Sequence, residues 1–176
     1  MRKPIVCIIT GPCGAGKSTI SKSLAKQIKK SAYIDVDILR DRMVRNGGVS
    51  PFFYKGESKK QIDLAIKNTS DLTNNFLKAG FNVFIDDVLE RKQQVKNYLK
   101  NIKSPRVYVF LLLPNRDVLK KRDSKRKKED IMGQRALDLH DIFTKRIPEE
   151  NWHVLDTSNH ITKETETEIL KILKIK

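Results

Sequence analysis

The stretch Gly11–Thr19, with the sequence GPCGAGKST, constrains the fold of this chain more than any other feature. It fits the pattern G-x-x-x-x-G-K-[ST] at every position. An apolar run that is typical of a strand, Ile5–Thr10, precedes it, and a helical pattern with Ile20 and Leu24 on one side follows it. A glycine-rich turn between a buried strand and a helix directs backbone N–H groups toward a phosphate. The sequence therefore predicts a phosphate-binding loop at this strand-to-helix junction.

The residues of this loop have distinct expected parts in holding a nucleotide. Lys17 is expected to reach the β- and γ-phosphates, and Ser18 is expected to ligate Mg²⁺. The helix N-terminus adds a partial positive charge. A chance glycine turn is the alternative, and the flanking strand and helix disfavour it. The expected nucleotide-binding residues of the loop are Gly11, Pro12, Cys13, Gly14, Ala15, Gly16, Lys17, Ser18 and Thr19.

Apolar runs alternate with longer amphipathic segments along the rest of the chain. Between Ile62 and Phe76 apolar residues recur at three- and four-residue steps, which predicts a long helix that ends near Gly80. Strands that alternate with helices form a parallel sheet with helices on both faces. No linker, repeat or low-complexity tract interrupts the pattern, so we expect an α/β, three-layer fold in a single domain, residues 1–176. The five expected strands are Ile5–Thr10, Ala32–Ile34, Phe81–Ile85, Val107–Leu113 and Trp152–Leu155.

The apolar runs and the cysteines exclude several classes of protein. The longest strongly apolar run, Val107–Leu113, is far shorter than the roughly 20 residues that a membrane span needs. The N-terminal sequence runs straight into the glycine loop without a cleavage-site pattern. The two cysteines, Cys7 and Cys13, provide neither a disulfide framework nor metal-ligand spacing. These features predict a cytoplasmic protein that has no membrane partner. A monomer or a homodimer is expected, and the sequence does not decide between them.

The net charge is unusual for a chain of this size. Lys and Arg number 36 against 21 Asp and Glu, which gives a formal charge of +15. Such a charge attracts phosphates of any kind, from a free nucleotide to a nucleic acid. Aromatic residues make up only 7% of the chain, and basic residues interleaved with aromatics, as in single-strand binders, are missing. A nucleic-acid partner is therefore possible but not favoured.

Two acidic sites follow predicted strands, where a parallel sheet presents ligand-binding residues. In YIDVD, Asp35 and Asp37 are two residues apart, so that one is expected to face Mg²⁺ and the other the phosphate acceptor. In VFIDDV, Asp86 is expected to complete the Mg²⁺ site with Ser18 and Asp35. The alternatives are that Asp37 caps the following helix and that Asp87 belongs to a polar turn or cap.

A basic segment at about residues 120–135 is expected to form a helical lid. Arg122 and Arg126 are four residues apart, which places them on one helix face, and Arg135 follows in MGQR. Guanidinium groups over the β- and γ-phosphates stabilise the charge that spreads there during phosphoryl transfer. The alternative for most of these basic side chains is a solvated helix surface. The loop 46–57 also breaks the alternation, and about residues 38–60 are expected to form a substrate-binding insertion.

Together these motifs resemble the small P-loop kinases of the chloramphenicol phosphotransferase, gluconate kinase, shikimate kinase and zeta-toxin type. YIDVD resembles the acidic pair at a strand end in shikimate and gluconate kinases. FNVFIDDV, the lid pattern R-[ED]-x-x-R at Arg122–Arg126 and the later Arg135 are similar to chloramphenicol phosphotransferase. Val154–Ser158 resembles a final strand that ends in D-T-[ST]. The resemblance covers nearly the whole chain.

This resemblance implies a fold, a nucleotide and roles for several residues. It implies a five-stranded parallel sheet in the order 2-3-1-4-5, with ATP as the nucleotide, and Thr157 and Ser158 near its adenine. In the family, the acid that matches Asp37 is the base for the acceptor hydroxyl. Arg40 and Asp87 are expected beside it as substrate-binding residues. The region 42–59 matches no antibiotic-site or sugar-acid pattern, so the acceptor stays open.

The main functional hypothesis is a kinase that uses ATP and Mg²⁺ and transfers the γ-phosphoryl group to a hydroxyl of a small molecule, such as a sugar acid or an antibiotic. Its expected catalytic residues are Lys17, Asp37, Arg122 and Arg126, and its expected metal ligands are Ser18, Asp35 and Asp86. One alternative is a kinase that acts on a nucleic-acid end or a nucleotide. The other is a non-catalytic nucleotide-binding module that regulates a partner, although the intact lysine, serine and acidic pairs disfavour a dead site.

Overall fold

Five parallel strands form one sheet in a computed structural model that describes residues 3–43, 54–146 and 152–175. The strand order is β2-β3-β1-β4-β5, which confirms the predicted order. Each observed strand begins or ends within two residues of its expected bounds. The strands are β1 (Val6–Thr10), β2 (Ser31–Asp35), β3 (Asn82–Asp86), β4 (Val107–Leu112) and β5 (His153–Leu155).

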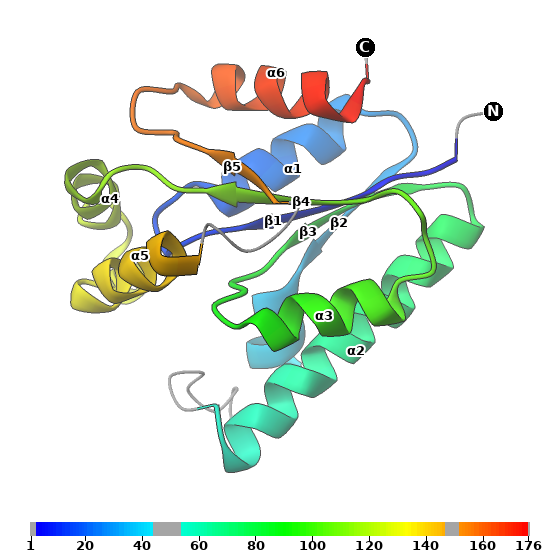
Figure 1. Cartoon of the computed structure of the whole chain (residues 1–176), viewed down its shortest axis with the longest axis horizontal. Helices are drawn as coiled ribbons and strands as arrows, with labels where there is room; N and C mark the ends of the chain where they lie inside the picture. The colour runs from blue at the N-terminus through cyan, green and yellow to red at the C-terminus, as the bar shows by residue number, and fades with distance from the viewer. Residues whose placement is uncertain (1–2, 44–53, 147–151, 176) are drawn as a thin grey trace.

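Helices cover both faces of the sheet, so the molecule has the expected three layers (Figure 1). Helices α1 (Lys17–Gln27) and α6 (Thr162–Leu173) lie on one face. Helices α2 (Gly56–Lys78) and α3 (Lys92–Asn101) lie on the other. None of the helices among the described residues combines the length and the apolar character needed to span a membrane.

The central strand β1 explains how one sheet carries two cores. Its side chains alternate between the faces, and all of them are buried. Cys7 and Ile9 pack in the cluster that contains α1 and α6 residues such as Leu24. Val6 and Ile8 pack in the cluster that contains residues of α2 and α3. A strand buried on both faces needs a continuous apolar run, which is why β1 was recognisable in the sequence.

Further helical elements lie beyond the carboxyl ends of the strands, where parallel sheets bind ligands. Helices α4 (Arg116–Asp123) and α5 (Gln134–Arg146) lie at this edge (Figure 1), joined through a short 3₁₀ turn, η2 (Lys128–Asp130). A π-helical turn, η1 (Ile38–Arg42), follows β2. The proposed insertion 38–60 lies partly outside the described residues, since 44–53 are not among them.

Candidate active site

The glycine loop between β1 and α1 has the geometry of an anion cradle. Gly11 has φ +146°, and a Cβ on this residue would lie 2.4 Å from the backbone oxygen of Leu112, so only glycine fits. Gly16 caps α1 at φ +98°, and α1 has neither a side-chain cap nor an acid in its first turn. No acid in the first turn of α1 therefore competes for the N–H groups at that end. Lys17 folds back over the loop, with Nζ donating to the Pro12 carbonyl at 3.2 Å.

Two carboxylates meet beside the loop because the strands are in register. Asp35 on β2 is paired with Asp86 on β3, and the Tyr33 hydroxyl lies 3.1 Å from Asp35 Oδ2 and 3.4 Å from Asp86 Oδ2. Burial raises the pKa of Asp86, whereas Lys17 and a hydrogen bond from Ser18 act to lower it. Two carboxylates and a hydroxyl beside a phosphate cradle suit Mg²⁺, which also takes ligands from phosphates and water.

Among the residues that the structure describes, no group of three or more His, Cys, Asp or Glu side chains is arranged to hold a metal ion. A metal at this edge would therefore depend on Ser18 and on oxygens of the nucleotide as well as on Asp35 and Asp86. Mg²⁺ in phosphoryl-transfer sites is bound in this way, through one or two carboxylates plus substrate phosphates.

A cavity of about 320 Å³ opens on one side of the loop, and we call it the α6-side cavity. Arg122 lies at its wall, where its guanidinium donates to the Thr157 carbonyl at 2.8 Å and to the Thr157 hydroxyl at 3.3 Å. Ser158 is not among its lining residues; the Ser158 hydroxyl accepts from the backbone N–H of Asn115 at 2.8 Å, at the start of α4. The lining residues are Ala15, Gly16, Thr19, Ile20, Leu112, Arg122, Thr157, His160, Ile161, Thr162 and Thr165.

A second cavity, of about 310 Å³, lies on the other side of the loop, and we call it the α2-side cavity. Cys13 of the loop contributes to its wall. The predicted substrate residues Asp37, Arg40 and Asp87 all line it. They are joined there by two lid arginines and by apolar side chains of α2. The lining residues are Cys13, Val36, Asp37, Arg40, Asp41, Ile62, Ala65, Ile66, Asp87, Val88, Glu90, Gln94, Arg126, Glu129, Asp130, Met132, Arg135 and Leu139.

Two of the acids that line this cavity, Asp37 and Asp87, have different surroundings. Asp37 has 62% of its side chain exposed and pairs with Arg40 at 3.0 Å, and its side chain makes no helix-capping hydrogen bond. Asp87 is buried, with Oδ2 accepting from the Tyr98 hydroxyl at 2.8 Å and Oδ1 from the Val88 N–H at 2.8 Å. Burial raises the pKa of Asp87 to about 7. Asp37 is thus the more accessible of the two carboxylates.

The lid arginines do not lie as the sequence predicted. Arg122 and Arg126 do not share a helix face, because α4 ends at Asp123 and the chain turns there. The buried Asp123 carboxylate accepts from the N–H groups of Met132 (3.0 Å) and Gly133 (2.8 Å), and it pairs with Arg126 at 3.2 Å. As a result Arg122 lines the α6-side cavity, whereas Arg126 lines the α2-side cavity.

Three residues that the sequence analysis did not select support this site. Tyr33 bridges Asp35 and Asp86, Tyr98 donates to Asp87, and Asp123 closes the turn after α4. Asp123 is a single acid in a run of basic residues, and the sequence shows that much. The sequence does not show that its carboxylate binds the backbone nine and ten residues later. Both tyrosines contact acids that are distant in the sequence or lie on a neighbouring strand.

A family model matches most of this chain. The AAA domain family, AAA_33, matches residues 6–142. That span runs from β1 through most of α5, so it contains the glycine loop, both acidic pairs and the lid.

Individual proteins resemble the chain over nearly its whole length. A guanylate kinase from Prochlorococcus marinus subsp. pastoris is 25% identical over 95% of this chain and 95% of that protein. Among solved structures, an unliganded sugar kinase from Janibacter sp. HTCC2649 has a TM-score of 0.75 and 17% identity over 98% of this chain and 95% of that one. A gluconokinase from Sinorhizobium meliloti 1021 has a TM-score of 0.71 and 15% identity over 99% and 94%. The two structures therefore share the fold of this chain.

Proposed function

Because the chain belongs to the AAA domain family AAA_33 and has the fold of the small P-loop kinases, we propose that it transfers the γ-phosphoryl group of ATP, with Mg²⁺, to a hydroxyl of a small molecule. One observation carries this proposal: two cavities open on opposite sides of one phosphate-binding loop. Gly16 and Thr19 line the α6-side cavity, and Cys13 lines the α2-side cavity. A donor and an acceptor bound in these cavities would meet at the loop.

The α6-side cavity suits the nucleotide. It adjoins the N-terminus of α1, and Arg122 and Thr157 lie at its wall. Phosphates in the loop would accept from the N–H groups of α1 and from Lys17, which then leaves the Pro12 carbonyl. Ser18, Asp35 and Asp86 would hold Mg²⁺, which offsets the phosphate charge when it is bound.

The α2-side cavity suits the acceptor. Asp37 accepts the proton of the acceptor hydroxyl while the hydroxyl oxygen bonds to the γ-phosphorus. The bond between the γ-phosphorus and the bridging oxygen breaks, and ADP leaves with the electron pair of that bond. Arg126 and Arg135 line the same cavity and stabilise the charge that develops at the transferred group.

Substitution of the accessible acid tests this function. We expect purified Asp37→Asn to bind MgATP as the wild type does, because Asp37 lies outside the α6-side cavity. Its transfer rate should fall by 10²–10⁴-fold, the usual contribution of a general base. Asp71→Asn, an exposed acid on α2, is the matched control. Full transfer by Asp37→Asn would remove this residue from the mechanism.

A nucleotide acceptor is the second candidate. It is favoured by the similarity to a guanylate kinase over 95% of both chains. In that case a nucleoside monophosphate would occupy the α2-side cavity, and the accepting oxygen would belong to a phosphate. Phosphotransfer from labelled ATP to GMP, compared with transfer to hydroxyl compounds, separates the two candidates.

A further inference from the structure

The α2-side cavity has a charge opposite to that of the molecule. Six carboxylates and three guanidinium groups line it, while the whole chain carries +15. Since the potential in a cleft is dominated by its nearest charges, the local sign decides what it attracts. The six acids are Asp37, Asp41, Asp87, Glu90, Glu129 and Asp130.

The three arginines of the cavity already have carboxylate partners. Arg40 pairs with Asp37 at 3.0 Å and with Asp41 at 2.8 Å. Arg135 pairs with Glu90 at 2.5 Å, and Arg126 pairs with Asp123 below the lid. An anionic acceptor would have to share these guanidinium groups with carboxylates that already neutralise them and would lie next to those carboxylates.

Three acids of the cavity stand outside these pairs. Asp87 lies buried against Tyr98, while Glu129 and Asp130 are exposed on the η2 turn of the lid. Asp87 lies on the sheet side of the cavity and the η2 acids on the lid side, so carboxyl groups bound the cavity from two elements. The η2 carboxylates attract a cation and repel an anion, and a cation bound nearby lowers the pKa of Asp87, which burial raises.

The opposite wall of the cavity is apolar. Ile62, Ala65 and Ile66 project from one face of α2, and all three are at least 94% buried. Val88 and Leu139 add further apolar surface to the lining of the cavity. Hydrocarbon groups of a ligand gain free energy by covering such a surface.

We propose, on the basis of the kinase function above, that the acceptor is an alcohol that carries a protonated amine and an apolar face and has no acidic group. The amine lies toward Asp87 or the η2 acids, the apolar face lies against α2, and the hydroxyl lies toward Asp37. Sugar acids and nucleoside monophosphates are then poor acceptors, because each brings a negative charge into this cavity.

A matched set of compounds tests the charge of the acceptor. Phenylalaninol has an amine, a hydroxyl and a phenyl ring; 3-phenylpropane-1,2-diol is uncharged, and 3-phenyllactate is an acid. Transfer from labelled MgATP is measured for these three, for glucosamine, glucose and gluconate, and for GMP. We expect kcat/KM to be at least about tenfold higher for phenylalaninol than for phenyllactate or GMP, since one misplaced charge at short range costs about this much.

The possible outcomes separate this inference from the kinase function. Faster transfer to the acids or to GMP would overturn the inference that the acceptor is a cation. If Lys17→Ala abolished that transfer, the kinase function would still stand. Transfer to none of the compounds by a protein that binds MgATP overturns both. Transfer to the neutral compounds at the same rate as to the amines overturns the inference that a cation is recognised.

A pair of variants assigns the effect to the cavity. The double variant Glu129→Gln/Asp130→Asn removes two carboxylates from the lid wall. It should raise KM for phenylalaninol by about three- to tenfold and leave KM for the uncharged diol unchanged. Asp71→Asn/Asp117→Asn removes two exposed carboxylates that do not line the cavity and should change neither value. Equal effects on both compounds, or in both variants, would contradict the inference.

Discussion

At the scale of single residues, burial of Asp87 lowers the free energy of unfolding by an amount that depends on pH. Burial raises its pKa from 3.8 to about 7, so between these values the folded chain holds a proton that the unfolded chain releases. The free energy of unfolding therefore falls as pH rises from about 4 to about 7, and it changes little from this residue above that range. At 1.36 kcal/mol per pH unit, the difference between the two pKa values changes the free energy of unfolding by at most about 4 kcal/mol.

Asp87→Asn should remove this dependence. The side chain keeps its shape, and the amide can still exchange a hydrogen bond with the Tyr98 hydroxyl. We expect wild type to lose about 2–3 kcal/mol relative to the variant between pH 5 and pH 8, measured by urea unfolding at each pH. Asp71→Asn, at an exposed site, should follow the wild type. Parallel curves for wild type and Asp87→Asn would mean that Asp87 is ionised throughout the range.

Some features of single residues could be predicted from the sequence, and others could not. Lys17 and Ser18 follow from a local pattern, and Asp35 and Asp86 follow from strand ends that a parallel sheet brings together. The pKa of Asp87 does not follow from any local pattern, because it depends on burial and on Tyr98, a helix away.

At the scale of elements, the lid depends on one buried carboxylate. Asp123 ends α4 and accepts from the N–H groups of Met132 and Gly133, which fixes the turn between α4 and α5. The backbone of Asp123 also approaches Gly14, where a Cβ would lie 3.4 Å from the Asp123 nitrogen. The turn is therefore packed directly on the phosphate-binding loop.

Asp123→Asn should loosen this turn. An amide oxygen in the place of Oδ2 can still accept from both N–H groups, but the charge that strengthens these bonds and the ion pair with Arg126 are lost. We expect the free energy of unfolding to fall by about 1–3 kcal/mol, with faster proteolysis between residues 124 and 133. Asp117→Asn, exposed on the same helix, should change the free energy of unfolding by less than about 0.5 kcal/mol. Equal protease sensitivity of the two variants would contradict this role of Asp123.

The elements themselves were predictable to different degrees. Buried strands such as β1 can be predicted from continuous apolar runs, and α2 can be predicted from its stripe of apolar residues. The prediction that Arg122 and Arg126 share one helix face was wrong. Their spacing indicates a shared face only if the helix continues through both residues. It ends at Asp123 through contacts with Met132 and Gly133, and no local pattern reveals those.

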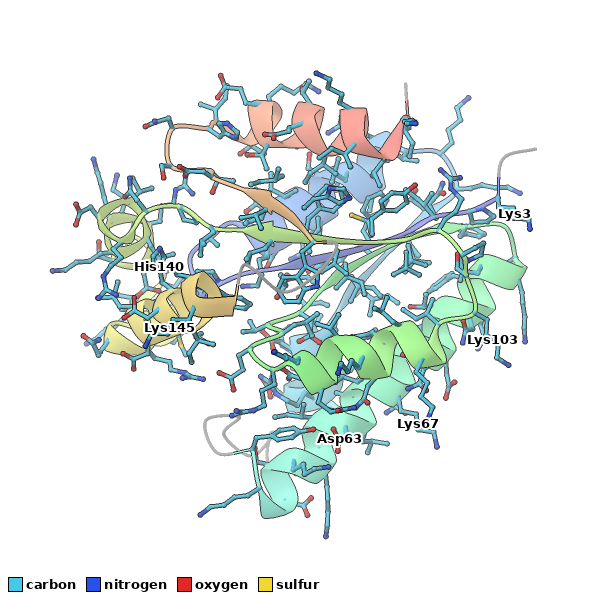
Figure 2. All side chains as sticks on the ribbon, in the orientation of Figure 1. Lys3, Asp63, Lys67, Lys103, His140 and Lys145 are labelled. Atoms are coloured by element: carbon cyan, nitrogen blue, oxygen red, sulfur yellow. The ribbon has the colours of Figure 1, made fainter. Side chains whose placement is uncertain are left out.

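At the scale of the whole molecule, positive charge is spread over separate surfaces. Figure 2 shows Lys3 and Lys103 at the end of the molecule opposite α5, Lys67 on α2 and Lys145 on α5. These four lysines lie on different sides and therefore do not belong to one track for a polynucleotide, which would need phosphate contacts in sequence. The acidic α2-side cavity lies within this positive surface, so the charge of the acceptor is decided locally.

Ligand binding at the loop should stabilise the whole fold, because the loop joins the central strand β1 to α1. At MgATP concentrations near 100 times Kd the free energy of unfolding should rise by about 2.7 kcal/mol. For a chain of this size that raises Tm by about 5–10 °C, measurable by calorimetry. Lys17→Ala should abolish most of the rise, because Lys17 is the cation nearest the cradle, whereas Lys67→Ala, exposed on α2, should keep it. An equal rise in both variants would mean that the nucleotide binds elsewhere than at the glycine loop.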